Sequence, residues 1–240
     1  MASKNSGART PKIIGSTKNL FESSRPGMLI QKFKKDVADN SLKKLPKQSK
    51  ANLANEISSY LFRCLEEFRI PTHFVEKISE SEMLVRRLDV IPLKVQVVNI
   101  ATGSFSKRLG VGKESELPFP IIEHYYKRGD LGLPLLNEFH IYALGLATPE
   151  QLRTINRLAS KANVILKSFF ERRGLKLISI ELEFGVAEDR IMIGDEISPK
   201  TCHFIDLQKR TKREKLRFMG NGACGIETYV EVRDRLYREV

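Results

Sequence analysis

ISIELEFGVAEDRIMIGDEISPKTCHFID, residues 178–206, is the stretch of sequence that decides the fold. Two runs rich in apolar and β-branched residues flank the turn-like residues 187–190, and this pattern predicts a β-hairpin. In the first run, alternation places Ser179, Glu181 and Glu183 on one face of the strand and apolar side chains on the other. The strand therefore buries one face and presents acids on the other, toward water or toward a ligand.

Carboxylates stand near the ends of both runs, each close to a glycine. Glu183 precedes Gly185 in the first run, and Asp195 follows Gly194 in the second. Acids at adjacent strand ends can hold Mg²⁺ against the phosphates of a nucleotide, because Mg²⁺ takes a few hard oxygen ligands and keeps some water. A polar hairpin with solvated acids fits the same spacing, so spacing alone leaves both interpretations open.

Two helices are predicted with clear boundaries. Residues 51–68 carry apolar side chains at helical spacing, and a proline shortly afterwards stops the helix. Residues 149–172 carry a broad apolar stripe, and Thr148 with Gln151 matches a capping box at the helix start. A weaker helix is expected over residues 225–238.

Strands and loops account for most of the remaining pattern. Residues 36–50 are polar and are predicted to form a loop, and residues 1–10 are predicted to form a flexible basic tail, not a secretory signal. The order of elements, mostly strands first and then mixed helices and hairpins, predicts an α+β fold. Further strands are expected over residues 13–14, 28–33, 72–78, 82–88 and 93–100.

The charge balance favours anionic partners. Lysine and arginine number 41 against 29 acids, which gives a net charge of +12. Such a balance suits nucleic acid, nucleotides or phosphorylated metabolites. The basic clusters contain almost no aromatic residues that could stack on bases, so a lysine-rich solvated surface is favoured over nucleic-acid binding.

Composition also disfavours two other classes of protein. No run of about 18 apolar residues occurs, so no membrane-spanning segment is expected. The three cysteines, Cys64, Cys202 and Cys224, are widely spaced and odd in number. This pattern predicts a reducing, cytoplasmic location and argues against a zinc site.

Several short motifs follow one another along the chain. They are Gly15–Phe21, Ile70–Phe74, Ile91–Leu93, Asn99–Ser104 with Lys107–Gly110, Pro120–Glu123, Leu182–Gly185 and Gly194–Pro199. Together these motifs resemble the phosphoribosylaminoimidazole-succinocarboxamide synthase (SAICAR synthetase) family over residues 13–238. The combination of LEFG, DEISP and GS-xx-KRLG is specific, although each motif alone is weak.

The resemblance implies a two-lobed α+β fold with a nucleotide cleft between the lobes. An antiparallel β-rich, nucleotide-binding lobe is expected over residues 11–90, and a larger C-terminal α/β lobe over residues 91–240. The implied reaction is the ATP-dependent joining of L-aspartate to the carboxylate of an aminoimidazole ribotide, CAIR, to give SAICAR in purine synthesis. The implied cofactors are ATP and Mg²⁺, the partners are small anionic substrates, and a homo-oligomer is compatible with the family.

The resemblance also assigns a nucleotide half of the site. A glycine loop and a lysine hold the phosphates, and two carboxylates hold Mg²⁺ and serve catalysis. A segment beginning at Leu84 is expected to meet adenine through backbone groups. The residues so assigned are Gly15, Lys18, Leu84 and Arg86 for ATP, with Glu183 and Asp195 for both metal and catalysis.

The acceptor half departs from the family pattern. Retained substrate-binding candidates are Ser104, Lys107, Arg108, Lys127 and His203, the last in place of an arginine. Changed family site positions are occupied by Ser16, Lys94, Val98, Ser179, Glu181, Lys200 and His203. Valine in place of a phosphate-binding arginine removes a charge-assisted contact of about 1.5–3 kcal/mol. Lys94 and Glu181 reverse the family's charges, so they can form a swapped pair.

Three functional hypotheses follow from these residues. The first is a ligase that makes SAICAR. The second is a catalytically impaired or repurposed relative that keeps nucleotide binding and has lost the ribotide and aspartate site. The third is a nucleic-acid-binding role driven by the basic surface.

Overall fold

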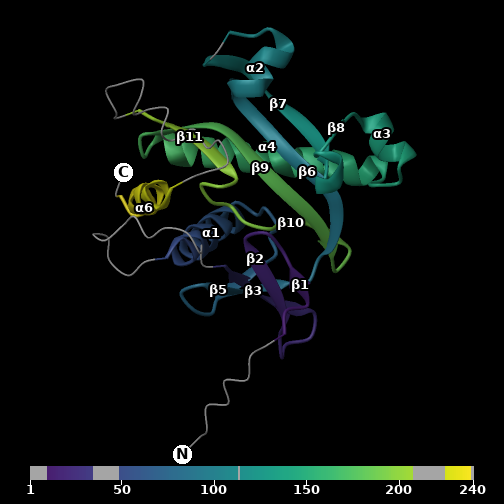
Figure 1. Cartoon of the computed structure of the whole chain (residues 1–240), viewed down its shortest axis with the longest axis vertical. Coiled ribbons are helices and arrows are strands. Elements are labelled where there is room, and N and C mark those ends of the chain that lie inside the picture. The colour runs from purple at the N-terminus through teal and green to yellow at the C-terminus, as the bar shows by residue number, and fades with distance from the viewer. Residues whose placement is uncertain (1–9, 35–48, 113, 208–224, 239–240) are drawn as a thin grey trace, which may run out of the picture.

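The computed structural model describes residues 10–34, 49–112, 114–207 and 225–238. Most of the predicted tail (1–10) and of the predicted loop (36–50) lies outside these ranges, as does Cys224. Within the described ranges the chain forms two antiparallel β-sheets with helices packed against them (Figure 1). The predicted α+β fold is confirmed.

The smaller sheet comes from the N-terminal part of the chain, in the order β1-β2-β3-β5-β4. Its strands are β1 (Ile13–Ile14), β2 (Lys18–Glu22), β3 (Met28–Phe33), β4 (Phe74–Lys77) and β5 (Glu82–Arg86). Their pairings are antiparallel. Strand β2 lies between the two strands that the sequence predicted over residues 13–14 and 28–33.

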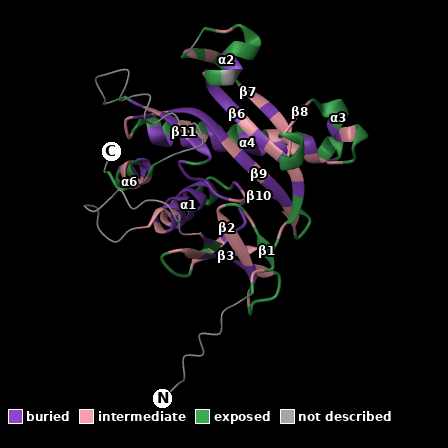
Figure 2. Cartoon of the chain, viewed as in Figure 1, coloured by how far each residue is buried: buried purple, intermediate pink, exposed green. Residues whose placement is uncertain are grey.

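The larger sheet follows the order β10-β9-β6-β7-β8, and β11 pairs with another part of β9. Its strands are β6 (Asp89–Ala101), β7 (Ser115–Tyr126), β8 (Leu135–Leu136), β9 (Leu175–Ala187), β10 (Arg190–Gly194) and β11 (Cys202–Asp206). Buried and less buried residues alternate over residues 91–97 of β6 and 180–184 of β9 (Figure 2), as expected where a strand packs one face.

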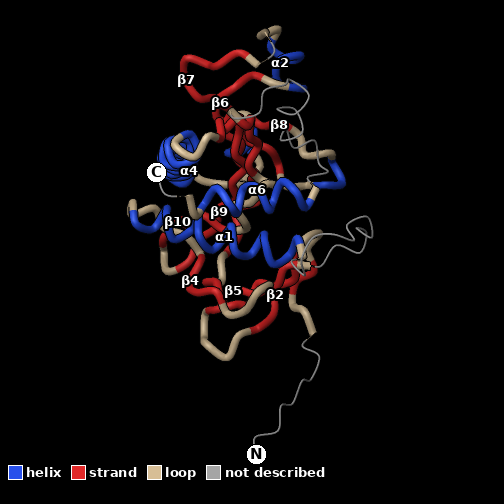
Figure 3. The backbone as a smooth tube through the Cα atoms, turned by 90° about the vertical axis from the view of Figure 1, so that its left-hand side faces the viewer, coloured by secondary structure: helices blue, strands red, loops and turns tan. Residues whose placement is uncertain are grey.

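The helices are α1 (Lys50–Glu67), α2 (Gly103–Leu109), the 3₁₀ turn η1 (Gly129–Leu131), α3 (Glu138–Ala143), α4 (Pro149–Glu171) and α6 (Ile226–Leu236). Helix α4 begins with the predicted capping box, in which Thr148 and Gln151 exchange hydrogen bonds. The apolar stripe of α4 packs on β9, and α1 covers the smaller sheet. Helix α6 lies along α1 (Figure 3), so the predicted terminal helix completes the core.

The predicted hairpin joins β9 to β10. Ala187 pairs with Arg190 across the turn residues Glu188 and Asp189. Both turn residues have left-handed backbone conformations, with φ of 51° and 57°. This geometry is that of the tight turn which matches the twist of a two-stranded ribbon. The turn therefore fixes the register that places Glu183 opposite Gly194.

The glycines of this hairpin make room for the crossing between the two sheets. A Cβ on Gly185 would lie 2.7 Å from the Leu88 Cβ and 2.8 Å from the Asp89 carbonyl oxygen. A Cβ on Gly194 would lie 2.8 Å from the Leu88 Cδ1. Leu88 can sit against the hairpin because both positions lack a side chain. The acids near these glycines are thereby held beside the smaller sheet.

A short backbone connection ties β10 to the segment that precedes β4. The His73 amide donates to the Ile193 carbonyl at 2.9 Å, and the Ile193 amide donates to the Pro71 carbonyl at 3.0 Å. Thr72 and Ile193 form a parallel bridge. The end of β10 and His73 therefore occupy fixed positions relative to each other.

Candidate functional site

A cavity of about 340 Å³ lies between the two sheets. Apolar side chains from β2, β3 and β5, among them Leu20, Leu29 and Val85, form part of its wall. Charged residues at the start of β2, on β9 and directly after β10 form another part. Predicted site residues on its wall are Gly15, Lys18, Arg86, Lys127, Glu183 and Asp195. The cavity thus collects five of the six residues assigned to the nucleotide, together with one assigned to the acceptor.

Lys18 anchors the charged end of the cavity. Its ammonium lies 2.8 Å from an Asp195 carboxylate oxygen and 3.0 Å from a Glu196 carboxylate oxygen. Burial alone would lower the pKa of Lys18, but the two adjacent carboxylates outweigh burial and raise it. Lys18 is therefore a fixed positive charge, as a phosphate-binding lysine must be.

Glu196 is a site residue that the sequence analysis missed. Its carboxylate is almost fully buried, and it accepts hydrogen bonds from Thr17 at 3.2 Å and Ser198 at 2.7 Å in addition to Lys18. The adjacent residue Asp195 has φ of 66°, a left-handed conformation that non-glycine residues adopt at a cost. This bend lets two consecutive acids reach the same ammonium, which an extended strand would not allow.

The two predicted metal carboxylates have opposite titration behaviour. Burial and the charge of Asp195 raise the pKa of Glu183, and Lys127, which pairs with Glu183, offsets only part of this effect. Burial also opposes ionisation of Asp195, but Lys18 outweighs burial and lowers the pKa of Asp195. Asp195 is therefore held ionised, whereas the charge of Glu183 is only partly neutralised by its neighbours.

These two acids fit a magnesium ion that is shared with a nucleotide. Protein Mg²⁺ sites commonly use one or two carboxylates and complete the shell with phosphates and water. The described residues contain no group of three or more His, Cys, Asp or Glu side chains that could hold a metal. Glu183 and Asp195 on one cavity wall match the smaller requirement, and an added cation would relieve the raised pKa of Glu183.

The loop at Gly15 is a tight turn. The Gly15 amide donates to the Lys18 carbonyl at 2.9 Å, and a Cβ on Gly15 would lie 2.8 Å from that oxygen. The Lys34 ammonium donates to the Gly15 carbonyl. Lys200 reaches the same loop, where its ammonium donates to the Thr17 hydroxyl at 3.2 Å. The loop is thus held by backbone and lysine contacts, although Ser16 stands where the family has a lysine.

Arg86 lines the cavity, whereas Leu84 is not among its lining residues. The Arg86 guanidinium lines the cavity and donates to the carbonyls of Thr72 and Phe74 at 3.2 and 3.0 Å. The Leu84 side chain packs with Phe21 and other apolar groups, in a cluster separate from the main core. A contact of the Leu84 segment with adenine through its backbone stays a prediction.

His73 is a buried wall residue of the cavity. Its ring packs edge-on against Phe62 with centroids 5.2 Å apart. Burial, together with the charges of Lys18 and Arg86, lowers the pKa of His73 to about 3. The imidazole is therefore neutral at physiological pH, and its ring packs within the cavity wall.

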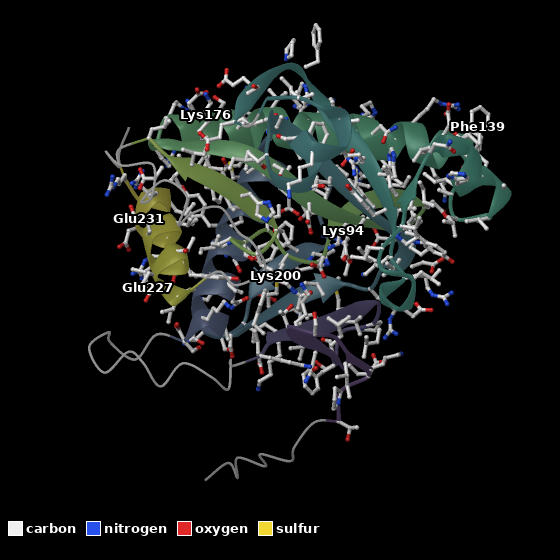
Figure 4. The ribbon with its side chains drawn as sticks, turned by 45° about the horizontal axis from the view of Figure 1, so that its top comes forward. Lys94, Phe139, Lys176, Lys200, Glu227 and Glu231 are labelled. Atoms are coloured by element: carbon white, nitrogen blue, oxygen red, sulfur yellow. The ribbon has the colours of Figure 1, made fainter. Side chains whose placement is uncertain are left out.

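Beyond Glu183, a polar face continues along β9 and its neighbours. Lys94 on β6 pairs with Glu181 on β9 at 2.9 Å, which confirms the predicted charge-swapped pair. Ser179 and His203 lie 3.1 Å apart across β9 and β11. Figure 4 shows Lys94 and Lys200 in the region between the two sheets. Burial lowers the pKa of His203, so this histidine offers a neutral ring rather than a fixed cation.

The change to Val98 places an apolar side chain at a buried position. Val98 is buried with Ala101 and Phe105 at the junction of β6 and α2. The position that carries a phosphate-binding arginine in the family pattern is therefore part of an apolar cluster here. An acceptor phosphate must find its cations elsewhere on this face.

The remaining acceptor candidates lie on α2, outside the lining of the nucleotide cavity. In both Figure 1 and Figure 3, α2 occupies the end of the molecule opposite β2. Lys107 is exposed, and the Ser104 side chain lies outside the described part of the structure. Arg108 pairs with Glu123, which also accepts a hydrogen bond from Tyr125 at 2.6 Å. Glu123 is thus a further polar residue of this region that lacked any assigned role in the sequence.

Comparison with known proteins gives a consistent result. The SAICAR synthetase family pattern matches residues 12–220. A phosphoribosylaminoimidazole-succinocarboxamide synthase of Chloroherpeton thalassium is 44% identical over 223 residues, covering 92% of this chain and 95% of that protein.

Solved structures agree over a similar extent. The phosphoribosylaminoimidazole-succinocarboxamide synthase of Ehrlichia chaffeensis superposes with a TM-score of 0.80 at 34% identity, covering 95% of this chain and 98% of that chain. A SAICAR synthetase in complex with ADP superposes with a TM-score of 0.81 at 34% identity, covering 94% and 97%. Sequence and fold both match along nearly the full described chain, and this chain therefore belongs to the SAICAR synthetase family.

Proposed function

We propose that this chain is an ATP-dependent ligase of purine biosynthesis that joins L-aspartate to the carboxylate of CAIR and forms SAICAR. The observation that carries the proposal is the meeting of Lys18, Glu183 and Asp195 on the wall of one cavity between the sheets. The family assignment supports the reaction class, and the apolar wall beside these charges suits a nucleotide base.

The charged end of the cavity is suited to a triphosphate. Lys18 supplies a permanent positive charge, and the tight turn at Gly15 brings backbone close to the same end. Glu183 and Asp195 would hold Mg²⁺, which neutralises charge on the phosphates when bound. Phosphoryl transfer depends mainly on positioning and on charge neutralisation, so these few groups supply what the nucleotide half requires.

We assign the acceptor to the polar face that continues from Glu183. Lys127 pairs with Glu183, so it stands at the junction of the nucleotide cavity and this face. Transfer of phosphate to the acceptor carboxylate gives an acyl phosphate, and the aspartate amine then displaces phosphate and forms the amide bond. The residues proposed to bind acceptor and aspartate are Ser104, Lys107, Arg108, Lys127 and His203.

The cellular location and the oligomeric state of the protein belong to the same proposal. No helix in the described residues is long and apolar enough to span a membrane. Cys64 and Cys202 are free and buried. A cytoplasmic location and a homo-oligomeric state stay predictions.

The direct test supplies ATP, Mg²⁺, L-aspartate and CAIR and quantifies SAICAR. We expect turnover by the unaltered chain and loss of turnover in Lys18→Met. Lys12→Met is the matched control, because Lys12 is exposed and pairs only with Glu22 at 2.5 Å among the described residues. Absence of SAICAR from correctly folded, unaltered protein would contradict the proposal.

A further inference from the structure

A second cavity lies on the other side of the β9–β10 hairpin from the nucleotide cavity. Its volume is about 550 Å³, and it is bounded by the hairpin, the first turns of α4 and the segment after α1. Val186 of β9 lines it, and Val186 points to the face opposite Glu183 because side chains alternate along a strand. The two cavities are therefore separated by the sheet.

Four cations line this second cavity: Arg69, Arg157, Lys161 and Arg190. Two acids, Glu150 and Asp189, also line it, so the formal balance of the wall is positive. Arg157 and Lys161 stand one helical turn apart on α4, a spacing at which like charges repel. All four cations are exposed at the cavity rim, and an anion bound among them would offset the repulsion between like charges.

These cations differ from most basic residues around the smaller sheet. Lys12, Arg25 and Lys32 each form an ion pair with a nearby glutamate. Within the described ranges, none of the four cations of the second cavity has an ion pair or side-chain hydrogen bond. Apolar side chains of Pro71, Leu158 and Ile191 lie among them, and Thr154 adds a hydroxyl. The lining of the second cavity therefore combines positive charges that are unpaired among the described residues with apolar side chains.

Two of the four cations stand at the start of segments that lead to the nucleotide cavity. Arg69 begins the run to His73, and Arg190 begins β10, which leads to Asp195. The two runs are joined by the backbone hydrogen bonds of Ile193 to Pro71 and His73. An anion held by Arg69 and Arg190 would therefore contact two joined segments whose far ends form part of the nucleotide site.

We propose that this cavity binds a compact polyphosphate anion and that its occupancy changes nucleotide affinity in the other cavity. The proposal goes beyond ligase activity, because it assigns a second, non-catalytic anion site on the opposite face of the large sheet. Coupling between sites is reciprocal in free energy, so each ligand must shift the affinity of the other by the same factor.

The first experiment titrates inorganic pyrophosphate into the full chain by calorimetry. We expect binding that is retained in Lys18→Gln and weakened by about tenfold or more in Arg157→Gln/Arg190→Gln, since two charge-assisted contacts are lost. Arg153→Gln is the matched control: Arg153 is exposed on the same helix and does not line this cavity. Circular dichroism establishes folding, and Lys161→Gln replaces the double variant if that variant unfolds.

Three results would overturn the proposal. They are no binding to the unaltered chain, equal affinity in the double variant and the unaltered chain, and loss of binding only in Lys18→Gln. The last result would place pyrophosphate in the nucleotide cavity. Because the readout is pyrophosphate binding, failure of SAICAR synthesis leaves this test intact.

The second experiment measures the Kd of Mg·ADP with and without saturating pyrophosphate. We expect a shift of several-fold in the unaltered chain and in Arg153→Gln, and no shift in Arg157→Gln/Arg190→Gln. An equal shift in the double variant would show competition at the nucleotide cavity and would contradict the coupling.

Discussion

Lys94 on β6 and Glu181 on β9 form an ion pair of 2.9 Å on the face of the large sheet that continues from the nucleotide cavity. Both side chains are about one quarter exposed, at 27% and 25%. The signs are reversed relative to the family pattern, yet the pair stays neutral. The reversal therefore preserves local neutrality while it changes which strand presents the cation.

Reversing both members of this pair tests that conclusion. Lys94→Glu alone brings a third carboxylate beside Glu181 and Glu183, and we expect it to destabilise the fold by about 1–2 kcal/mol, between the exposed and buried limits for ion pairs. Lys94→Glu/Glu181→Lys should recover most of that loss. Urea unfolding of the single and double variants measures the difference. A double variant no more stable than Lys94→Glu would show that the two residues do not interact.

The two cavity carboxylates should respond oppositely to neutralisation. The pKa of Glu183 is raised, so its ionised form weakens the ligand-free fold once the pH exceeds the unfolded pKa of about 4.3. We expect Glu183→Gln to stabilise the ligand-free protein at pH 7, with a gain that shrinks as the pH falls toward 4. The pKa of Asp195 is lowered, so its ionised form contributes stability at neutral pH that is lost in acid.

Asp195→Asn should therefore destabilise the ligand-free protein at pH 7, because Lys18 loses a partner. Thermal unfolding of both variants between pH 4 and pH 8 measures the two trends. Effects of the same sign for Glu183→Gln and Asp195→Asn would contradict the assigned electrostatics.

His73 predicts a separate acid dependence. Its folded pKa is about 3, below the unfolded value of about 6.5, so the unfolded chain binds its proton first as the pH falls. This group alone should remove up to about 1.4 kcal/mol of stability per pH unit between those values. His73→Gln should have a shallower decline over the same range, measured by urea unfolding at several pH values. An unchanged slope would mean that His73 is not the titrating group.

Alanine variants of the two hairpin glycines should differ in how far a second substitution restores their stability. Gly194→Ala places a Cβ 2.8 Å from the flexible Leu88 Cδ1, whereas Gly185→Ala also meets the Asp89 carbonyl oxygen at 2.8 Å. We expect each to cost about 1–3 kcal/mol by overpacking. Adding Leu88→Ala should relieve part of the cost at Gly194 and little at Gly185.

Gly129→Ala is the matched control, because no atom lies within 4 Å of a Cβ built there. Unfolding free energies of these variants decide the comparison. Equal rescue at both hairpin positions would show that the Asp89 backbone does not limit the Gly185 site.

Local periodicity predicted the elements that depend on it. Helix α4 and the β9–β10 hairpin follow the predicted pattern. The placement of Lys18, Glu183 and Asp195 on one cavity wall agrees with what the family resemblance implied. Glu196 was missed because strand alternation sends consecutive side chains to opposite faces. The left-handed backbone at Asp195 breaks that alternation. The presence of an aspartate does not by itself predict a left-handed conformation.

Other elements lacked a readable signal. Helix α2 is seven residues long and α3 is six, too short for a stripe of helical periodicity. Strand β7 contains Pro118 and Pro120, which weaken a prediction of strand. The burial of Val98 depends on packing against Phe105 on α2, a contact made only once β6 and α2 have folded together.

The central claim is that a magnesium-bound nucleotide sits between the Lys18 loop and the acids at positions 183 and 195. Calorimetric titration of Mg·ATP into the unaltered chain and into Glu183→Ala tests it most directly, with Glu76→Ala as the control because Glu76 lies on β4 and pairs with the exposed Arg25 at 2.7 Å. We predict tight binding by the unaltered chain and the control, and affinity at least about tenfold weaker in Glu183→Ala, since a metal ligand is lost. Binding by Glu183→Ala that equals binding by the unaltered chain, or no binding by either, would contradict the account.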